Sequence, residues 1–159
     1  MKSELGVGTT VIIRILAQTG ERAEDSDQGV KASLQPRHAL VVDDELLVCQ
    51  ILTKYLTGDG HTVETAADGR EGLEKFQAGK FDLVIVDRAM PEMNGDELAA
   101  AIKQRELNMP VVMVIGFGDF MGAGHEKPEN VAYIVSKLIT LTVFREIFVK
   151  VTAPSKIHE

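Results

Sequence analysis

The sequence contains a single cysteine, no tryptophan and few other aromatic residues. Cys49 lies in an apolar pattern of helical spacing, so the chain by itself can build neither a disulfide framework nor a cysteine metal site. The net charge is -7 and no basic stripe is visible, which argues against a nucleic-acid-binding surface. No apolar run is long enough to span a bilayer, and the first residues do not read as a signal peptide. These absences predict a soluble, cytoplasmic chain without direct membrane contact.

The length of 159 residues suits one domain of ordinary size with an appendage. Residues 6–16 form a glycine turn and a strand-like apolar run, and residues 17–35 are polar without helical or strand periodicity. We therefore predict that residues 1–36 hold a tail strand and a flexible linker. The folded domain is predicted over residues 37–152 and a C-terminal tail over residues 153–159.

From residue 38 onward, strand patterns alternate with helical patterns. This alternation predicts right-handed βαβ crossovers and a parallel sheet covered on both faces by helices, the α/β class. Asp68, Asn94 or Asp96, and Thr140 are the predicted starts of three helices. A short, mobile helix is expected within the glycine-rich residues 116–129. The predicted strands cover residues 38–43, 61–66, 83–87, 110–115 and 131–135.

Two of the buried-strand patterns end on carboxylates. The run before Asp87 is continuous and rich in β-branched residues, and an earlier run stops on the pair Asp43 and Asp44. In parallel sheets ligands bind beyond the carboxyl ends of the strands. Three carboxylates gathered there repel one another, so a hard divalent cation, Mg²⁺ above all, is the natural occupant. Any one of these aspartates could instead simply cap the helix that follows it.

Three motifs in a fixed order carry a resemblance to a known family. They are VVDDE at residues 41–45, VDRAMPEMNG at residues 86–95, and Lys137 after an apolar run. Together they resemble the receiver domain of two-component response regulators. The resemblance implies a doubly wound, five-stranded parallel sheet of the flavodoxin-like type. It also implies that Asp87 accepts a phosphoryl group from a phosphohistidine on a histidine kinase or a histidine phosphotransfer protein.

The resemblance also assigns roles to single residues. Asp44 and Asp87 become direct Mg²⁺ ligands together with the backbone carbonyl of Ala89, and Asp43 binds the ion through water. Lys137 supplies a second cation for the phosphoryl group, although a lone lysine is usually a solvated surface group. Gly116 offers a backbone N–H to the phosphoryl oxygens. The chain is then a signalling domain rather than an enzyme, apart from self-catalysed transfer and hydrolysis.

The sequence departs from the family pattern at three positions. Ile115 stands where the family carries a Ser or Thr, and it offers no hydroxyl to the phosphoryl oxygens. Ile134 aligns with the switching aromatic, whereas Tyr133 lies one place away and points to the opposite face of a strand. Leu138 replaces the proline that follows the lysine. These departures predict a weakened conformational response to phosphorylation and leave the phosphorylation chemistry in place.

The sequence is compatible with three functions. The leading one is that of a phosphoacceptor. The second is a binding-only receiver that docks a partner without switching, and the third is a magnesium-dependent phosphatase, which would need a second acid at Ala89.

Residues 6–16 resemble the closing strand segment of histidine-kinase ATP-binding domains. This resemblance suggests that the chain is the C-terminal receiver of a hybrid histidine kinase; a stray N-terminal strand is the alternative. The sequence is also compatible with a homodimer.

Overall fold

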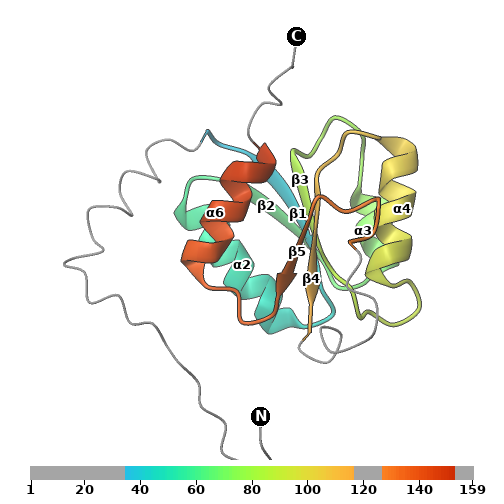
Figure 1. The fold of residues 1–159 in the computed structure, drawn as a ribbon, viewed down its shortest axis with the longest axis horizontal. Coiled ribbons are helices and arrows are strands. Elements are labelled where there is room, and N and C mark those ends of the chain that lie inside the picture. Colours follow the sequence, from blue (N-terminus) through green and yellow to red (C-terminus); the bar gives the residue numbers. More distant parts are fainter. Residues whose placement is uncertain (1–34, 117–126, 153–159) are drawn as a thin grey trace, which may run out of the picture.

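The computed structural model describes residues 35–116 and 127–152. It contains one sheet of five parallel strands in the order β2-β1-β3-β4-β5 (Figure 1). This is the doubly wound, flavodoxin-like arrangement that the sequence predicts. The strands are β1 (His38–Val42), β2 (Thr62–Ala66), β3 (Leu83–Asp87), β4 (Val111–Ile115) and β5 (Tyr133–Ser136). The helices are α2 (Leu46–Gly58), α3 (Gly69–Lys75), α4 (Gly95–Arg105) and α6 (Leu141–Thr152).

The helices cover the sheet on both faces and enclose two cores. Helices α2 and α6 lie on one face and α3 and α4 on the other (Figure 1). The strands β1, β3 and β4 are almost wholly buried, as their continuous apolar runs predict. Alternate residues of each strand enter opposite cores, so that Ile134 packs against one cluster and Val135 belongs to the other.

Side-chain caps set the starts of three helices, α3, α4 and α6. Asp68 Oδ1 accepts a hydrogen bond from Glu71 N at 2.8 Å ahead of α3. Asn94, rather than Asp96, caps α4 and forms a reciprocal capping box with Glu97. Thr140 Oγ1 accepts a hydrogen bond of 3.4 Å from Val143 N at the start of α6. These contacts satisfy N–H groups that have no partner inside the helix.

Four of the five strands differ from their predicted ranges by one or two residues at an end, and two element ends have a clear physical cause. Helix α3 ends at Lys75 because Phe76 leaves the helical conformation and packs its ring into the core, where it is 2% exposed. Strand β5 begins at Tyr133, two residues later than predicted, since Val131 N bonds to Pro128 O in a turn instead of joining the sheet. The helix predicted within residues 116–129 lies almost entirely outside the described residues.

No helix in the described part of the chain combines the length and the apolar character needed to cross a membrane.

Candidate functional site

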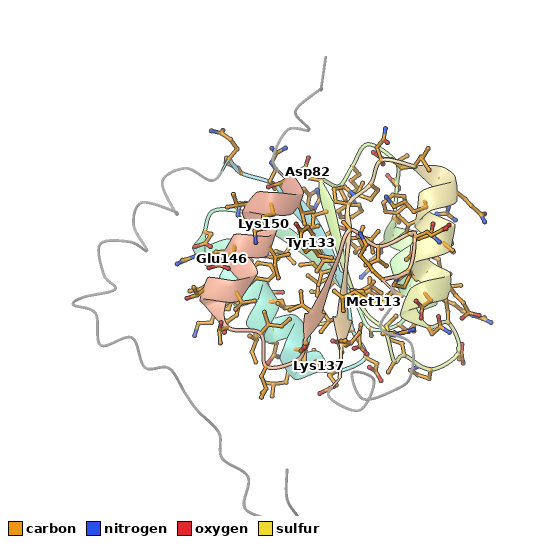
Figure 2. The ribbon with its side chains drawn as sticks, in the orientation of Figure 1. Asp82, Met113, Tyr133, Lys137, Glu146 and Lys150 are labelled. Atoms are coloured by element: carbon orange, nitrogen blue, oxygen red, sulfur yellow. The ribbon has the colours of Figure 1, made fainter. Side chains whose placement is uncertain are left out.

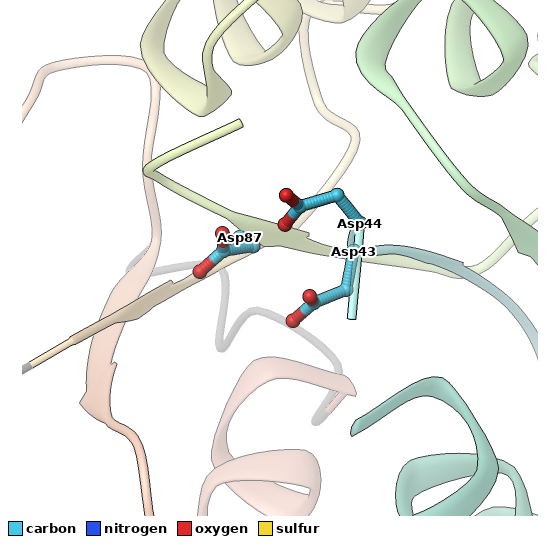
Figure 3. A group of neighbouring side chains, drawn as sticks. All are labelled: Asp43, Asp44 and Asp87. Atoms are coloured by element: carbon cyan, nitrogen blue, oxygen red, sulfur yellow. The ribbon is translucent and has the colours of Figure 1, made fainter. Parts of the chain in front are cut away.

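Three carboxylates meet at the carboxyl edge of the sheet. Val42 of β1 lies beside Val86 of β3 in the parallel register, so the residues that follow them, Asp43 and Asp87, are neighbours. Asp44 joins them from the loop after β1. The three side chains can offer oxygen atoms that all lie within 4.8 Å of one another (Figure 3). The strand order therefore brings together acids that are more than forty residues apart in the sequence.

Lys137 brings a cation to the same edge from the end of β5 (Figure 2). Its Nζ lies 3.2 Å from Asp87 Oδ1 and 3.7 Å from Asp43 Oδ2. The backbone fixes this position, because Lys137 N donates a hydrogen bond of 2.7 Å to the carbonyl of Ile115 at the end of β4. Strands β1, β3 and β5 thus supply the carboxylates and the ammonium of one site.

Burial changes the ionisation of the two inner acids. Asp43 and Asp87 are each only 2% exposed. Burial raises the pKa of Asp43 to about 6 and the nearby charge of Asp87 adds to the rise, whereas a hydrogen bond from Glu45 N opposes it. Burial also raises the pKa of Asp87, and the charge of Lys137 opposes that rise. The folded state therefore holds these acids in an environment that disfavours their charge.

Glu45 is a part of this site that the sequence reasoning missed. Its Oε1 lies 2.5 Å from Lys137 Nζ, across 92 positions of sequence. Burial lowers the pKa of Lys137, but the hydrogen bond to Glu45 and the charges of Asp43 and Asp87 outweigh it and raise this pKa above its usual value. The signal was present in the sequence, because Glu45 directly follows two acids at the end of a strand.

The residues present suit a hard divalent cation. Asp43 Oδ2 and Asp87 Oδ1 are buried and face the ammonium of Lys137 at 3.7 Å and 3.2 Å, and no other described residue donates a hydrogen bond to them. Two buried carboxylate oxygens that share a single ammonium are costly, and carboxylate oxygens are the ligands that Mg²⁺ prefers. Asp44 is exposed and can turn its oxygens toward the same point. The donor set and the unsatisfied oxygens therefore fit Mg²⁺.

The loop after Asp87 is fixed by backbone contacts. Gly95 N donates a hydrogen bond of 3.0 Å to Arg88 O, and a Cβ at position 95 would lie 2.5 Å from the carbonyl oxygen of Asp87. Only glycine permits this approach of α4 to the end of β3. Met90 and Met93 pack on the core formed with α3 and α4, as expected of packing residues. The loop therefore holds the Asp87 backbone in place.

The three departures from the family pattern occupy different environments. Ile115 is 5% exposed and its side chain belongs to the core beside α4. Ile134 packs against the same core, while Tyr133 is 38% exposed. Leu138 is 97% exposed and takes a φ of 74°, a left-handed conformation that is unfavourable for leucine. Thus the position of the usual hydroxyl is filled by a buried branched hydrocarbon.

Ala89 and Gly116 were assigned contacts with a metal ion and with a phosphoryl group. Ala89 lies two residues after Asp87 on the loop, and Gly116 directly follows β4. Each stands at the correct edge of the sheet. The metal contact of the Ala89 carbonyl and the phosphoryl contact of the Gly116 N–H remain predictions.

Comparison with known proteins agrees with this geometry. Residues 39–148 match the response regulator receiver domain family. The chain belongs to this family. A 105-residue stretch is 36% identical to the transcriptional regulatory protein GlrR of Escherichia coli strain K12, which covers 66% of this chain and 24% of that protein. This receiver chain also resembles the transcriptional regulatory protein TcrA of Mycobacterium tuberculosis, with 37% identity over 79 residues, 50% of this chain and 31% of that protein.

Solved structures give the same family and fold. A response regulator receiver domain protein from Clostridium thermocellum has a TM-score of 0.68 and 29% identity, covering 73% of this chain and 94% of that chain. The response regulator TrrA from Thermotoga maritima, in complex with Mg²⁺ and BeF, has a TM-score of 0.65 and 28% identity, covering 72% and 98%. By contrast, this receiver chain spans only about a quarter to a third of the length of the curated relatives named above.

Proposed function

We propose that the chain is the phosphoacceptor of a two-component phosphorelay and takes a phosphoryl group from a phosphohistidine onto Asp87 with Mg²⁺. The observation that carries this proposal is the cluster itself. Three carboxylates with oxygens within 4.8 Å of one another face an ammonium 3.2 Å from Asp87. Family membership supports it, as does the Mg²⁺ and BeF complex of the related TrrA.

In this mechanism the residues of the chain mainly position groups and balance charge. A carboxylate oxygen of Asp87 attacks phosphorus while the bond from phosphorus to the donor nitrogen breaks, and the donor histidine leaves neutral after it takes up a proton. Lys137 provides hydrogen-bond donors and positive charge for the phosphoryl oxygens, and Gly116 provides a backbone N–H. The buried setting of Asp87 strengthens these electrostatic interactions because little water screens them.

The carboxylates hold the metal in this proposal. Asp44, Asp87 and the Ala89 carbonyl are the direct ligands, and Asp43 acts through water. Bound Mg²⁺ supplies positive charge that offsets both the carboxylates and the phosphoryl oxygens. Without that charge, the acids of this site repel an incoming phosphate.

The test is phosphoryl uptake from acetyl phosphate, followed by intact-protein mass spectrometry. We expect one phosphoryl group per chain with Mg²⁺ and none with a chelator. Asp87→Asn should abolish labelling, and Asp68→Asn is the matched control because Asp68 caps α3 and an asparagine caps equally well. Full labelling of the Asp87→Asn variant, or labelling that ignores the chelator, contradicts the proposal.

A second candidate function is a binding-only receiver that docks a partner without a conformational response. The buried Ile115 favours it, because a residue without a hydroxyl cannot follow the phosphoryl group. Trapping a stable acyl phosphate on Asp87 would separate the two candidates, because a module that only binds its partner takes up no phosphoryl group. The intact set of Asp43, Asp44, Asp87 and Lys137 favours the phosphoacceptor.

The partner and the setting of the chain are part of the proposal. A histidine kinase or a histidine phosphotransfer protein is the proposed donor, in the cytoplasm. The resemblance of residues 6–16 to a kinase segment supports a hybrid histidine kinase, whereas the curated relatives are named as transcriptional regulatory proteins. Phosphotransfer from a panel of purified donors will identify the partner. A preference for a kinase domain that belongs to the same polypeptide would support the hybrid arrangement.

A further inference from the structure

The ammonium of Lys137 is shared between the inner acids and an outer one. Its Nζ lies 3.2 Å from Asp87 Oδ1 on the buried side and 2.5 Å from Glu45 Oε1 on the solvent side. The Glu45 side chain is 58% exposed, whereas that of Asp87 is 2% exposed. The nearest carboxylate to Lys137 is therefore neither the proposed acceptor nor a proposed metal ligand.

We propose that Glu45 is a positioning residue that restrains phosphoryl uptake by holding the Lys137 ammonium and by adding negative charge on the open side of the site. This inference rests on the proposed function. A hydrogen bond between two charged groups is among the stronger ones in proteins, so Glu45 competes with a phosphoryl oxygen for the same donors. Its charge also repels a phosphate dianion that approaches Asp87.

The charges near Asp87 make this effect substantial. The ammonium of Lys137 contacts Asp43, Glu45 and Asp87, and Asp44 lies beside two of these acids. Four carboxylates, one ammonium and one Mg²⁺ in the site would leave an excess of one negative charge. Neutralising Glu45 removes that excess. Because Glu45 is exposed, the repulsion it causes is screened by salt, which gives the effect a signature of its own.

The Glu45 side chain has no other role in the described structure. Glu45 is the N-cap of α2, yet its side chain makes no capping hydrogen bond. Its contact with Asp43 comes from the backbone N, and the bonds to its carbonyl come from Val48 and Cys49. A glutamine keeps all of these backbone contacts. The variant Glu45→Gln should therefore fold normally and change only the charge and the hold on Lys137.

The kinetic test is the second-order rate constant for phosphorylation by acetyl phosphate at saturating Mg²⁺. In this reaction Asp87 forms a bond to phosphorus, the acyl oxygen–phosphorus bond breaks and acetate leaves. We expect Glu45→Gln to react roughly three- to tenfold faster than the natural chain at low salt, with the advantage shrinking as salt rises. Glu64→Gln is the matched control, because Glu64 pairs with Lys80 at 2.8 Å outside this site.

A second readout needs neither metal nor phosphate. In the metal-free protein, the side-chain ammonium signal of Lys137 in ¹⁵N NMR should shift and exchange faster in Glu45→Gln, and should stay unchanged in Glu64→Gln. Equal rates for the natural chain and Glu45→Gln, or an unmoved Lys137 signal, overturn the inference. A natural chain that is never labelled overturns the proposed function and this inference with it, whereas a labelled chain whose variant is no faster overturns the inference alone.

Discussion

The substitution Asp43→Asn should stabilise the metal-free protein, and by an amount that grows with pH. The folded state raises the pKa of Asp43 from 3.8 to about 6. Between these two values the unfolded chain releases the proton while the folded chain keeps it, so the natural protein loses stability as pH rises. Above about 6 both states are ionised and the penalty is constant. An asparagine at this position carries no such penalty.

The size of the effect follows from the two pKa values. Ionising Asp43 costs the folded state about 1 kcal/mol at about pH 4.5 and about 3 kcal/mol at about pH 7.5. These values are upper bounds on the gain from Asp43→Asn, because the substitution also changes the contacts of the side chain. The gain in unfolding free energy of Asp43→Asn over the natural chain should therefore grow by about 2 kcal/mol across this range. The hydrogen bond from Glu45 N can be kept, since an amide oxygen accepts it as a carboxylate does.

The assay is urea unfolding at a series of pH values in the presence of a chelator, with the natural chain, Asp43→Asn and Asp68→Asn. The control exchanges the same groups at an exposed helix cap and should change stability little throughout. Added Mg²⁺ should stabilise the natural chain more than Asp43→Asn, because the ion offsets the buried charge. A difference between Asp43→Asn and the natural chain that is the same at every pH would refute the reasoning.

Three further predictions concern single positions beside the site. Gly95→Ala should lower the unfolding free energy by about 1–3 kcal/mol, because the new Cβ meets the Asp87 backbone at 2.5 Å. Gly58→Ala, which meets nothing within 4 Å, should cause no loss in the same urea experiment, and equal losses would refute the steric argument. Leu138→Gly should raise the unfolding free energy by up to about 1 kcal/mol, because glycine adopts the left-handed conformation without strain, while the exposed Leu107→Gly should lower it. A loss for both leucine variants would contradict this. Ile115→Thr should enlarge the amide shift changes on beryllofluoride binding, whereas Ile115→Val, whose side chain has the shape of threonine without the hydroxyl, should not. Ile115→Thr should also cost about 1–3 kcal/mol of stability because the site is buried. Equal shift changes in Ile115→Thr and Ile115→Val would show that the missing hydroxyl does not limit the response.

The class of fold and the acidic cluster were predictable from the sequence. Continuous apolar runs that alternate with helical patterns indicate a parallel sheet, and the carboxyl ends of parallel strands lie at one edge. That rule places Asp43, Asp44 and Asp87 at one edge, because each follows a buried run, whereas their close approach depends on β1 and β3 being neighbours in the sheet. The caps at Asp68 and Asn94 were equally local, since a capping side chain bonds only to the first turn of its own helix.

Only the tertiary structure determined how these residues interact. The burial that raises the pKa of Asp43 and Asp87 depends on what packs around them, and the contact of Glu45 with Lys137 joins residues 92 positions apart. The left-handed backbone of Leu138 likewise follows from how the chain leaves β5, since its sequence favours no such conformation. Local patterns fix which residues reach the edge of the sheet, whereas distances and charge states at that edge depend on contacts between strands that local patterns do not encode.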